Sequence, residues 1–525
     1  FIIVKIQREE IVMKSKKKIV NRIFNRIFLV GILLVIQVIW FIIFLLDLTS
    51  QSWWINILFT FISILAILIV INKEDNPAYK LAWVIPILCF PLFGGLLYVF
   101  CGNKKPTRKL RRKIEQVDTL LEEYRKQDKT ILKEIGAFDK GVLGQVKYLS
   151  NIVKFPIYKN TRTQYFESGE KNFPVMLQEL KKAKHFIFME YFIIHDGRMG
   201  GDILEILKQK AKQGVEVRLL YDDFGSLTTL PYQYYKELEE CGIHCEAFNP
   251  VVPILSIVMN NRDHRKILVI DGHTGFTGGI NLSDEYINEK ERFGYWKDTG
   301  IMLKGEAVWN LTLMFLEIWN ALRPTDQNFE EFLPHHYHPE PFEGDGYVQP
   351  YGDSPLDEET VGENVYLNII NAAQEYLYAF TPYLIIDNEM ITALCLAAKR
   401  GVDVRIVTPQ IPDKKTVFCL TQSYYRQLSE AGVKIYQFTP GFIHAKCMVC
   451  DDKVATVGTI NLDYRSLYLH FECGVFLYQT KSVLAVKEDA KKTIEKSTFI
   501  TPELMKQGFF KNLWQAILRL FAPLM

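Results

Sequence analysis

A histidine, a lysine and an aspartate recur with the same spacing at two places in this 525-residue chain. The two H-x-K-x-x-x-x-D sets are His264, Lys266 and Asp271, and, 180 positions later, His444, Lys446 and Asp451. Because the chain has only 10 histidines, a chance match of both sets is improbable. An imidazole beside an ammonium group suits an anionic substrate, and the duplication indicates that both sets serve one shared site.

Two imidazoles, two ammonium groups and two amides around one pocket are suited to phosphodiester transfer. One histidine attacks phosphorus as a nucleophile, and the other, when protonated, delivers a proton to the departing alkoxide. Negative charge that builds on the phosphoryl oxygens would be held by Lys266, Lys446, Asn281 and Asn461, each Asn lying 17 residues after its histidine. The pattern therefore predicts a phosphohistidine intermediate.

Four carboxylates are candidates for orienting groups. Asp271 and Asp451 lie in turns, where we expect them to orient or neutralise neighbours, although a purely turn-forming role is an equally good interpretation. Asp298 and Glu472 follow the histidine of their own half by 34 and 28 residues. A carboxylate bonded to the far ring nitrogen would fix the tautomer of a catalytic imidazole, whereas the alternative is an exposed surface carboxylate.

The repeat extends well beyond the two motifs. Gly278-Gly279 corresponds to Gly458-Thr459, and the segment 212–218 corresponds to 399–405. Apolar, β-rich runs alternate with amphipathic helical stretches in both copies, which predicts a duplicated α/β sandwich domain. Each motif should lie on a strand that opens a β-hairpin, so that the histidine and the lysine two positions later project together.

Three apolar segments precede the repeat, at 27–46, 53–71 and 81–101, each long enough to cross a hydrocarbon core of about 30 Å. Basic clusters before the first segment and after the third both favour the cytoplasm. Pro86, Pro91 and Gly94-Gly95 interrupt the third segment, so we expect it to be broken or re-entrant. The sequence thus predicts a multi-pass membrane protein with a cytoplasmic catalytic part.

The predicted organisation has six parts, which we delimit from composition and from the repeat. They are a membrane domain at 13–113, a juxtamembrane helical linker at 114–150, a first α/β domain at 151–332, a linker at 333–345, a second α/β domain at 346–500 and a C-terminal amphipathic segment at 501–525. The C-terminal segment has helical apolar spacing and could dock on the core or lie on a membrane surface.

Charge and cysteine content exclude other classes of function. The net charge is only +2, from 62 basic and 60 acidic residues, which does not favour nucleic acid as a partner. Nine scattered cysteines argue against a disulfide framework. Cys447-x-x-Cys450 lacks a second pair at zinc-site spacing, and the histidines at 335, 336 and 338 fall in the linker, so we expect no metal and no cofactor.

The paired motifs resemble the phospholipase D superfamily, and most of the chain is similar to the bacterial cardiolipin synthase family. The second likeness is carried by Asn261 to Lys266, Gly278 to Asn281, Gly458 to Ser466 and the membrane-proximal stretch from Asn76 to Gly102. The resemblance implies that a phosphatidyl group passes from one phosphatidylglycerol to another, releasing glycerol, in the bacterial cell membrane. By analogy with the superfamily, His264 is the nucleophile and His444 the acid.

The resemblance also assigns two groups of site residues. It implies an active site of His264, Lys266, Asp271, His444, Lys446 and Asp451, with substrate contacts from Gly278, Gly279, Asn281, Gly458, Thr459 and Asn461. Two other functions remain open. The same phosphohistidine with water as acceptor would make the protein a membrane-bound phospholipase D-type hydrolase or nuclease, and another acceptor alcohol would make it a different transphosphatidylase. A non-enzymatic scaffold would not need two intact motifs.

Overall fold

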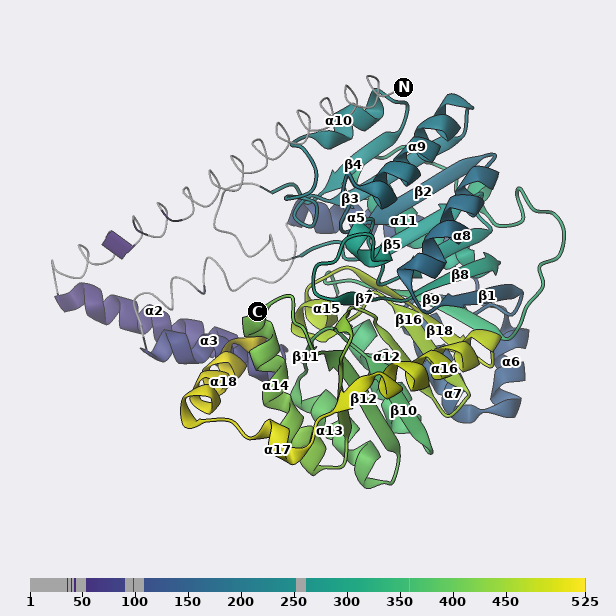
Figure 1. Ribbon diagram of the computed structural model, residues 1–525. Helices are drawn as coiled ribbons and strands as arrows, with labels where there is room; N and C mark the ends of the chain where they lie inside the picture. Colours follow the sequence, from purple (N-terminus) through teal and green to yellow (C-terminus); the bar gives the residue numbers. More distant parts are fainter. Residues whose placement is uncertain are drawn as a thin grey trace, which may run out of the picture.

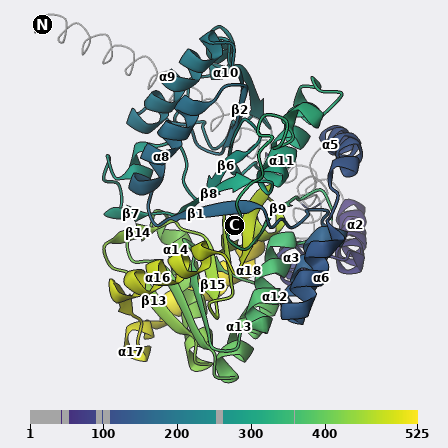
Figure 2. The ribbon, with the colours of Figure 1, turned by 90° about the vertical axis from the view of Figure 1, so that its right-hand side faces the viewer.

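The protein folds into two stacked α/β halves, each built on one mixed sheet (Figure 1). The computed structural model describes residues 53–89, 98, 108–251, 261–357 and 359–524, together with the isolated positions 35, 39, 42 and 43. Figure 2 shows the first half above the second, with the N-terminal helices along one side of both. The apolar run that precedes the first motif lies outside the described residues from position 252 to 260.

The first half is a seven-stranded sheet in the order β1-β8-β6-β5-β2-β3-β4. Its strands are β1 (Thr161–Phe166), β2 (Phe186–Tyr191), β3 (Glu216–Asp222), β4 (His244–Phe248), β5 (Lys266–Ile270), β6 (Thr274–Gly278) and β8 (Gly300–Gly305). Strands β2, β3 and β4 run parallel, and the remaining neighbours pair antiparallel. Its helices are α8 (Gly169–Lys182), α9 (Arg198–Lys212), α10 (Tyr234–Glu239) and α11 (Val308–Leu322).

The second half repeats this order as β9-β18-β16-β15-β10-β12-β13, with β19 added beyond β13. Its strands are β9 (Tyr347–Asp353), β10 (Tyr376–Phe380), β12 (Asp403–Pro409), β13 (Lys434–Phe438), β15 (Cys447–Cys450), β16 (Val454–Gly458), β18 (Glu472–Tyr478) and β19 (Ser497–Phe499). Its helices are α12 (Val361–Ala372), α13 (Asn388–Lys399), α14 (Lys415–Glu430), α15 (Tyr464–Tyr468) and α16 (Lys481–Glu495). The matching strand orders confirm the predicted duplication of an α/β sandwich.

Two helices join the halves. Helix α11 is buried almost throughout and packs on β2 and β5 of the first sheet and on β9 of the second. Helix α16 contacts β1 of the first sheet and β15 of the second. Phe315 on α11 stacks on Phe188 of β2, and a buried apolar side chain of this kind contributes about 1.5–3 kcal/mol by leaving water. One hydrophobic cluster therefore continues from the first half into the second, and a separate cluster lies almost wholly within the first half.

Short parallel pairings also cross the molecule near its centre. Strand β7 (Tyr295–Lys297) of the first half pairs with β14 (Gly441–Ile443) of the second, and β11 (Leu384–Ile385) pairs with β17 (Leu462–Asp463) within the second half. The pairing of β7 with β14 brings the chain just before His444 against the chain just before Asp298.

Helices from both ends of the chain lie along the two halves. They are α2 (Trp53–Asn72), α3 (Pro77–Cys89), α5 (Arg108–Leu121), α6 (Lys129–Phe138), α7 (Lys140–Lys147), α17 (Pro502–Met505) and α18 (Phe509–Phe521). Helix α3 contacts α18 and the short turn after it. The Asn76 amide, just before α3, donates to Asp387 Oδ2 at 2.9 Å and to the Tyr468 hydroxyl at 3.0 Å. These bonds tie the N-terminal helices to the second half.

The three apolar segments expected at the N-terminus are only partly described. The segment 27–46 lies outside the described residues apart from four isolated positions, whereas 53–71 coincides with α2. The third segment begins in α3, which contains Pro86, and most of it beyond Cys89 is outside the described residues. Within the described parts of the chain, a search finds no helix with the length and apolar character needed to span a membrane.

Candidate active site

Both motif histidines are held by the half of the protein to which they do not belong. The backbone amide of His264 donates to the carbonyl of Phe471 at 2.9 Å, and that of His444 donates to the carbonyl of Lys297 at 2.7 Å. Phe471 and Lys297 directly precede the two candidate orienting carboxylates. Each histidine is thereby placed beside the carboxylate of the other half.

The carboxylates reach the inner ring nitrogens. His264 Nδ1 lies 2.8 Å from Glu472 Oε1, and His444 Nδ1 lies 2.7 Å from Asp298 Oδ2. The sequence did not specify which histidine each carboxylate meets, and the structure pairs each with the histidine of the opposite half, because β7 pairs with β14 and Asp263 bridges to Phe471. A carboxylate on Nδ1 holds the proton there and leaves the lone pair of Nε2 for chemistry.

The two lysines lie under the histidines. Lys266 and Lys446 each donate an Nζ proton to the carbonyl oxygen of the histidine two positions earlier. Lys446 Nζ also lies 3.0 Å from His444 Nε2. Burial lowers the pKa of Lys266 to about 8 and that of Lys446 to about 7. The ammonium groups are thus buried at the centre of the site, where they can meet phosphoryl oxygens.

Burial also acts on the histidines and on Asp298. The pKa of His264 and that of His444 are well below the usual value, because burial disfavours the imidazolium and the two lysines add repulsion. Burial raises the pKa of Asp298 to about 7, against the attraction of Lys446. At neutral pH the free site therefore holds neutral imidazoles, which is the protonation state that a nucleophile needs.

The two asparagines are not equivalent. Asn281 accepts from the amide of Ile193 at 3.0 Å and donates to the Tyr286 hydroxyl at 2.7 Å, so the protein itself uses both ends of its amide. Asn461 is buried, and its Oδ1 makes no hydrogen bond within the described part of the chain. A free amide oxygen accepts, so this atom suits a donor such as a substrate hydroxyl, whereas a phosphoryl oxygen would have to meet the Nδ2–H of Asn461.

Gly279 and Thr459 support the carboxylates. The Thr459 hydroxyl donates to Glu472 Oε2. At the equivalent position, a Cβ on Gly279 would lie 2.1 Å from Asp298 Oδ1, so only glycine leaves room for that carboxylate. Gly279 and Thr459 thus help to place the two carboxylates that bond to the motif histidines.

Gly278 and Gly458 pack against neighbouring strands. A Cβ at Gly278 would lie 2.4 Å from the carbonyl oxygen of Thr299, and a Cβ at Gly458 would lie 2.4 Å from that of Cys473. These glycines permit close pairing of β6 with β8 and of β16 with β18, and their contact with substrate stays a prediction.

The motif aspartates lie at the far ends of β5 and β15 from the histidines. Asp271 accepts from the amides of residues 184, 185 and 186 at 2.8–2.9 Å. Asp451 accepts in the same way from residues 374, 375 and 376. Of the two interpretations left open by the sequence, this geometry favours the turn-forming one.

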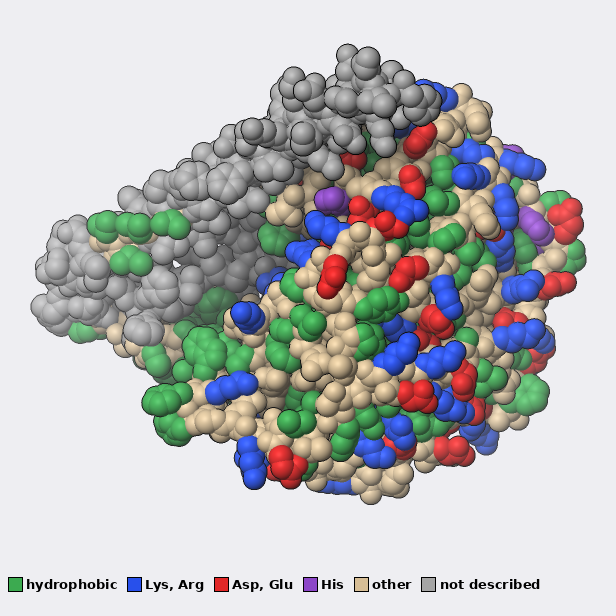
Figure 3. Space-filling model, in the orientation of Figure 1, with side chains coloured by type: hydrophobic (Ala, Val, Ile, Leu, Met, Phe, Trp, Pro, Cys, Tyr) green, Lys and Arg blue, Asp and Glu red, His purple; other side chains and the backbone are tan. Residues whose placement is uncertain are grey.

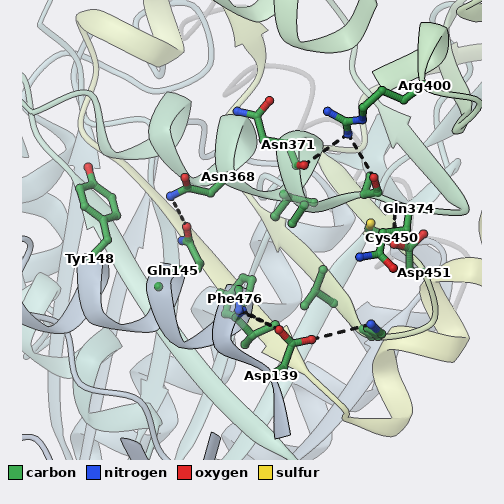
Figure 4. Close-up of a pocket in the computed structure, with 18 residues that line it drawn as sticks. Asp139, Gln145, Tyr148, Asn368, Asn371, Gln374, Arg400, Cys450, Asp451 and Phe476 are labelled. Atoms are coloured by element: carbon green, nitrogen blue, oxygen red, sulfur yellow. Dashed lines mark hydrogen bonds and ion pairs between the residues drawn. The ribbon is translucent and has the colours of Figure 1, made fainter. Parts of the chain in front are cut away.

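Asp451 also lines a pocket of about 930 Å³ on the outer side of the second half (Figure 4). Its lining includes Gln145 and Asn368, which are hydrogen bonded to each other at 2.6 Å, with Tyr148 on one side of them and Arg400 on the other. Arg400 donates to three backbone carbonyls around the end of α12. None of the motif histidines or lysines lines this pocket, so it is separate from the candidate active site.

A third histidine in the site was missed by the sequence analysis. The His470 ring centroid lies 5.6 Å from that of His264, and its Nδ1 lies 3.8 Å from Glu472 Oε1. The side chain is only 10% exposed, and neither ring nitrogen makes a hydrogen bond within the described residues. Its position two residues before Glu472, next to a candidate orienting carboxylate, was the available signal.

Two sandwich domains that meet at paired H-x-K motifs are the arrangement of the phospholipase D class. The solved structure of phosphatidylserine synthase from Haemophilus influenzae has the same fold, with a TM-score of 0.54 over 74% of this chain and 98% of that chain, at 15% identity. A family model described as cardiolipin synthase, PLD-like domain, matches residues 176–304 and again 366–494. A second model, phospholipase D-nuclease N-terminal, matches residues 61–103.

Curated relatives match over nearly the whole length. The cardiolipin synthase of Alkalihalophilus pseudofirmus is 35% identical over 90% of this chain and 95% of its own, and that of a Geobacillus species is 36% identical over 88% and 92%. An uncharacterized protein of Streptococcus mutans is 46% identical over 88% of this chain and 99% of its own. The chain belongs to the cardiolipin synthase family.

Proposed function

We propose that this protein is a phosphatidyltransferase that joins two molecules of phosphatidylglycerol into cardiolipin and releases glycerol. The observation that carries the proposal is the pair of neutral, buried imidazoles, each fixed at Nδ1 by a carboxylate of the opposite half. The relatives named cardiolipin synthase supply the substrate class. Two imidazoles and two ammonium groups provide the nucleophile, the acid and the charge stabilisation, so the proposed reaction needs no cofactor.

The first step breaks the bond between phosphorus and the glycerol headgroup. His264 Nε2 attacks phosphorus, and His444, which has acquired a proton, gives it to the departing glycerol oxygen. The negative charge of the arriving phosphodiester favours imidazolium, so it offsets the low pKa of His444 in the free protein. The products of this step are free glycerol and a phosphatidyl group bound covalently to His264.

The second step passes the phosphatidyl group to an acceptor. Neutral His444 removes the proton from a glycerol hydroxyl of a second phosphatidylglycerol, whose oxygen then attacks phosphorus and displaces His264. Lys266, Lys446 and Asn461 hold the phosphoryl oxygens in both steps, where charge accumulates. We assign Asp271 and Asp451 to the stability of the two sheets and Asn281 to the fixing of Tyr286.

The chain presents apolar surfaces that suit a lipid environment. On α2 the exposed side chains include Trp54, Phe61 and Leu68. On α18, Phe509 and Phe510 are 75% and 84% exposed, although Leu518 is buried against the protein. Figure 3 shows hydrophobic side chains gathered at the lower left, where Figure 1 places α18. We therefore propose a membrane location, with the exposed apolar side chains of α2 and α18 against the lipid and the catalytic halves in the cytoplasm.

Reconstitution tests the reaction directly. Purified full-length protein is mixed with phosphatidylglycerol as the sole lipid, and cardiolipin and glycerol are followed by mass spectrometry beside a His264→Ala control. Equal amounts of both products, absent from the control, are expected. Phosphatidic acid with glycerol would show that water is the acceptor and would replace the synthase with a hydrolase.

Protease accessibility tests the location. In sealed, right-side-out vesicles, the catalytic halves should resist a protease added outside and become digestible after the vesicles are opened. Digestion from the outside without opening would contradict the proposed orientation.

A further inference from the structure

Three metal-ligating side chains converge beside the histidine that we assign as the nucleophile. They are His264, His470 and Glu472, whose candidate ligand atoms all lie within 4.8 Å of one another. Two imidazoles and one carboxylate form a donor set that zinc takes in catalytic sites, where a fourth position stays open. The cluster comes from two segments that only the folded protein brings together, the first motif and the start of β18.

The spacings suit a tetrahedral ion. Zinc binds nitrogen and oxygen at about 2.0–2.2 Å, which places neighbouring ligand atoms about 3.3 Å apart in a tetrahedron. Glu472 Oε1 lies 2.8 Å from His264 Nδ1 and 3.8 Å from His470 Nδ1, so the observed distances fall on either side of that value. Small side-chain rotations would therefore close the three ligands around one ion.

His470 gives the second, independent sign of a ligand. Its ring is nine-tenths buried, yet neither nitrogen makes a hydrogen bond within the described residues. Buried polar groups in native proteins are normally paired, so an unpaired imidazole facing a carboxylate indicates a group that binds there. Neither the two-step transfer reaction nor the packing of the halves uses this ring.

We propose that His264, His470 and Glu472 form an inhibitory site for Zn²⁺. In the active state the Nδ1 proton of His264 is donated to Glu472, and the lone pair for attack is on Nε2. A zinc ion on Nδ1 takes the lone pair of that nitrogen, so the proton moves to Nε2. Protonated Nε2 has no lone pair to offer phosphorus, and the nucleophile is switched off until the metal leaves.

Charge bears on the affinity of this site for the ion. The carboxylate of Glu472 attracts the ion, whereas Lys266 and Lys446 nearby repel it. The repulsion limits the affinity, which suits a reversible inhibitor better than a permanently bound ion.

The expected inhibition rests on the proposed function, whereas metal binding does not, so the two are measured separately. Full-length protein, stripped with a chelator, is dialysed against Zn²⁺ alone and the bound metal is counted. Cardiolipin formation from phosphatidylglycerol is then followed in the same range of Zn²⁺. We expect one ion at this site, a rate that falls as the site fills, and full recovery after chelation.

His470→Asn is the decisive variant, because asparagine keeps a polar side chain of similar size but is a poor zinc ligand. Relative to its own rate without metal, this variant should need at least about tenfold more Zn²⁺ for binding and for inhibition. His338→Asn is the matched control. His338 lies in the linker, its ring centroid is 5.1 Å from that of His273, and it is not one of the three proposed zinc ligands. This control should bind zinc and be inhibited like the parent.

Two results would overturn the zinc site. The first is that the parent protein binds no more zinc than His470→Asn does. The second is that zinc inhibits the parent and His470→Asn equally. Failure of the proposed function would look different. The parent protein would make no cardiolipin with or without metal, yet dialysis would still show one zinc ion bound to the parent and none bound at this site in His470→Asn.

Discussion

Nδ1 of His264 in the first half lies 2.8 Å from Oε1 of Glu472 in the second. His444 and Asp298 repeat this relationship in the opposite direction at 2.7 Å. Each half therefore contributes one imidazole and the carboxylate that orients the other half's imidazole. Neither half alone contains a complete histidine and carboxylate pair, so the site depends on correct docking of the two sheets.

The first prediction concerns these carboxylates. Glu472→Gln keeps the size of the side chain but removes the charge that holds the His264 proton on Nδ1. We expect kcat for cardiolipin formation to fall by about 10²- to 10⁴-fold, because the wrong tautomer would predominate. Initial rates at saturating phosphatidylglycerol measure the effect.

Asp298→Asn should have an effect of similar size, since it acts on His444. Glu285→Gln serves as a control, because this carboxylate bonds Ser283 and Arg292 and neither motif histidine. A loss below threefold in both test variants would mean that the carboxylates do not set the tautomers.

Much of the fold could be predicted because the repeat is visible in local pattern. The alternation of apolar runs and amphipathic stretches predicted the two sandwiches, and matching segments around the motifs predicted their duplication. The strand order within each sheet could not be predicted, nor could the packing of α11 and α16 against both sheets. Both depend on contacts between residues far apart in the chain.

The candidate active site could likewise be predicted only in part from the sequence. Residue type and spacing pointed to the histidines, the lysines and both orienting carboxylates. Which histidine each carboxylate meets could not be predicted, because pairing across the halves is set by β7 with β14 and by the contact of Asp263 with Phe471. His470 was missed because it belongs to neither motif and becomes part of the site only through that same contact.

The second prediction is a pH profile. Burial lowers the pKa of Lys446 to about 7, and its ammonium form is needed to hold the phosphoryl oxygens. As pH rises through this pKa the ammonium is lost, so kcat/KM should fall on the alkaline side. A bound phosphodiester stabilises the ammonium, which should move the corresponding fall in kcat to higher pH.

Lys446→Arg checks the assignment, because guanidinium stays protonated throughout this range. The alkaline fall should then shift toward the pKa of Lys266, about 8. Asp298 also has a pKa of about 7, but it gains charge as pH rises, so a dependence of activity on its carboxylate has the opposite sign. An unchanged profile in Lys446→Arg would assign the fall to another group.

The third prediction separates the motif aspartates from the chemistry. Asp271 and Asp451 each accept from three backbone amides at the start of a central strand. Asp271→Ala leaves those amides without their acceptor and should destabilise the protein by about 2–4 kcal/mol. The kcat of protein that remains folded should change by less than about threefold. Denaturant unfolding and rate measurements on the same sample test this, and a loss of kcat without a loss of stability would return Asp271 to the active site.

The fourth prediction concerns a buried ion pair behind the first motif. Arg265 Nε lies 2.6 Å from Glu190 Oε1, and both side chains are almost completely buried. Arg265 also lies over the Phe471 ring, at 5.7 Å, next to the residue that orients His264. Arg265→Met leaves the Glu190 carboxylate buried without its partner and should cost about 3–5 kcal/mol of unfolding free energy.

The double variant Arg265→Met with Glu190→Gln tests whether the unpaired charge is the cause. Removing both charges should recover at least half of the lost stability, because a neutral amide is far less costly to bury than an isolated carboxylate. Glu190→Gln alone should destabilise less than Arg265→Met, since the guanidinium keeps its ion pair with Asp263 Oδ1 at 3.3 Å. If the three unfolding free energies were simply additive, the two side chains would be energetically independent, and the destabilisation of Arg265→Met would have to come from lost packing against Phe471.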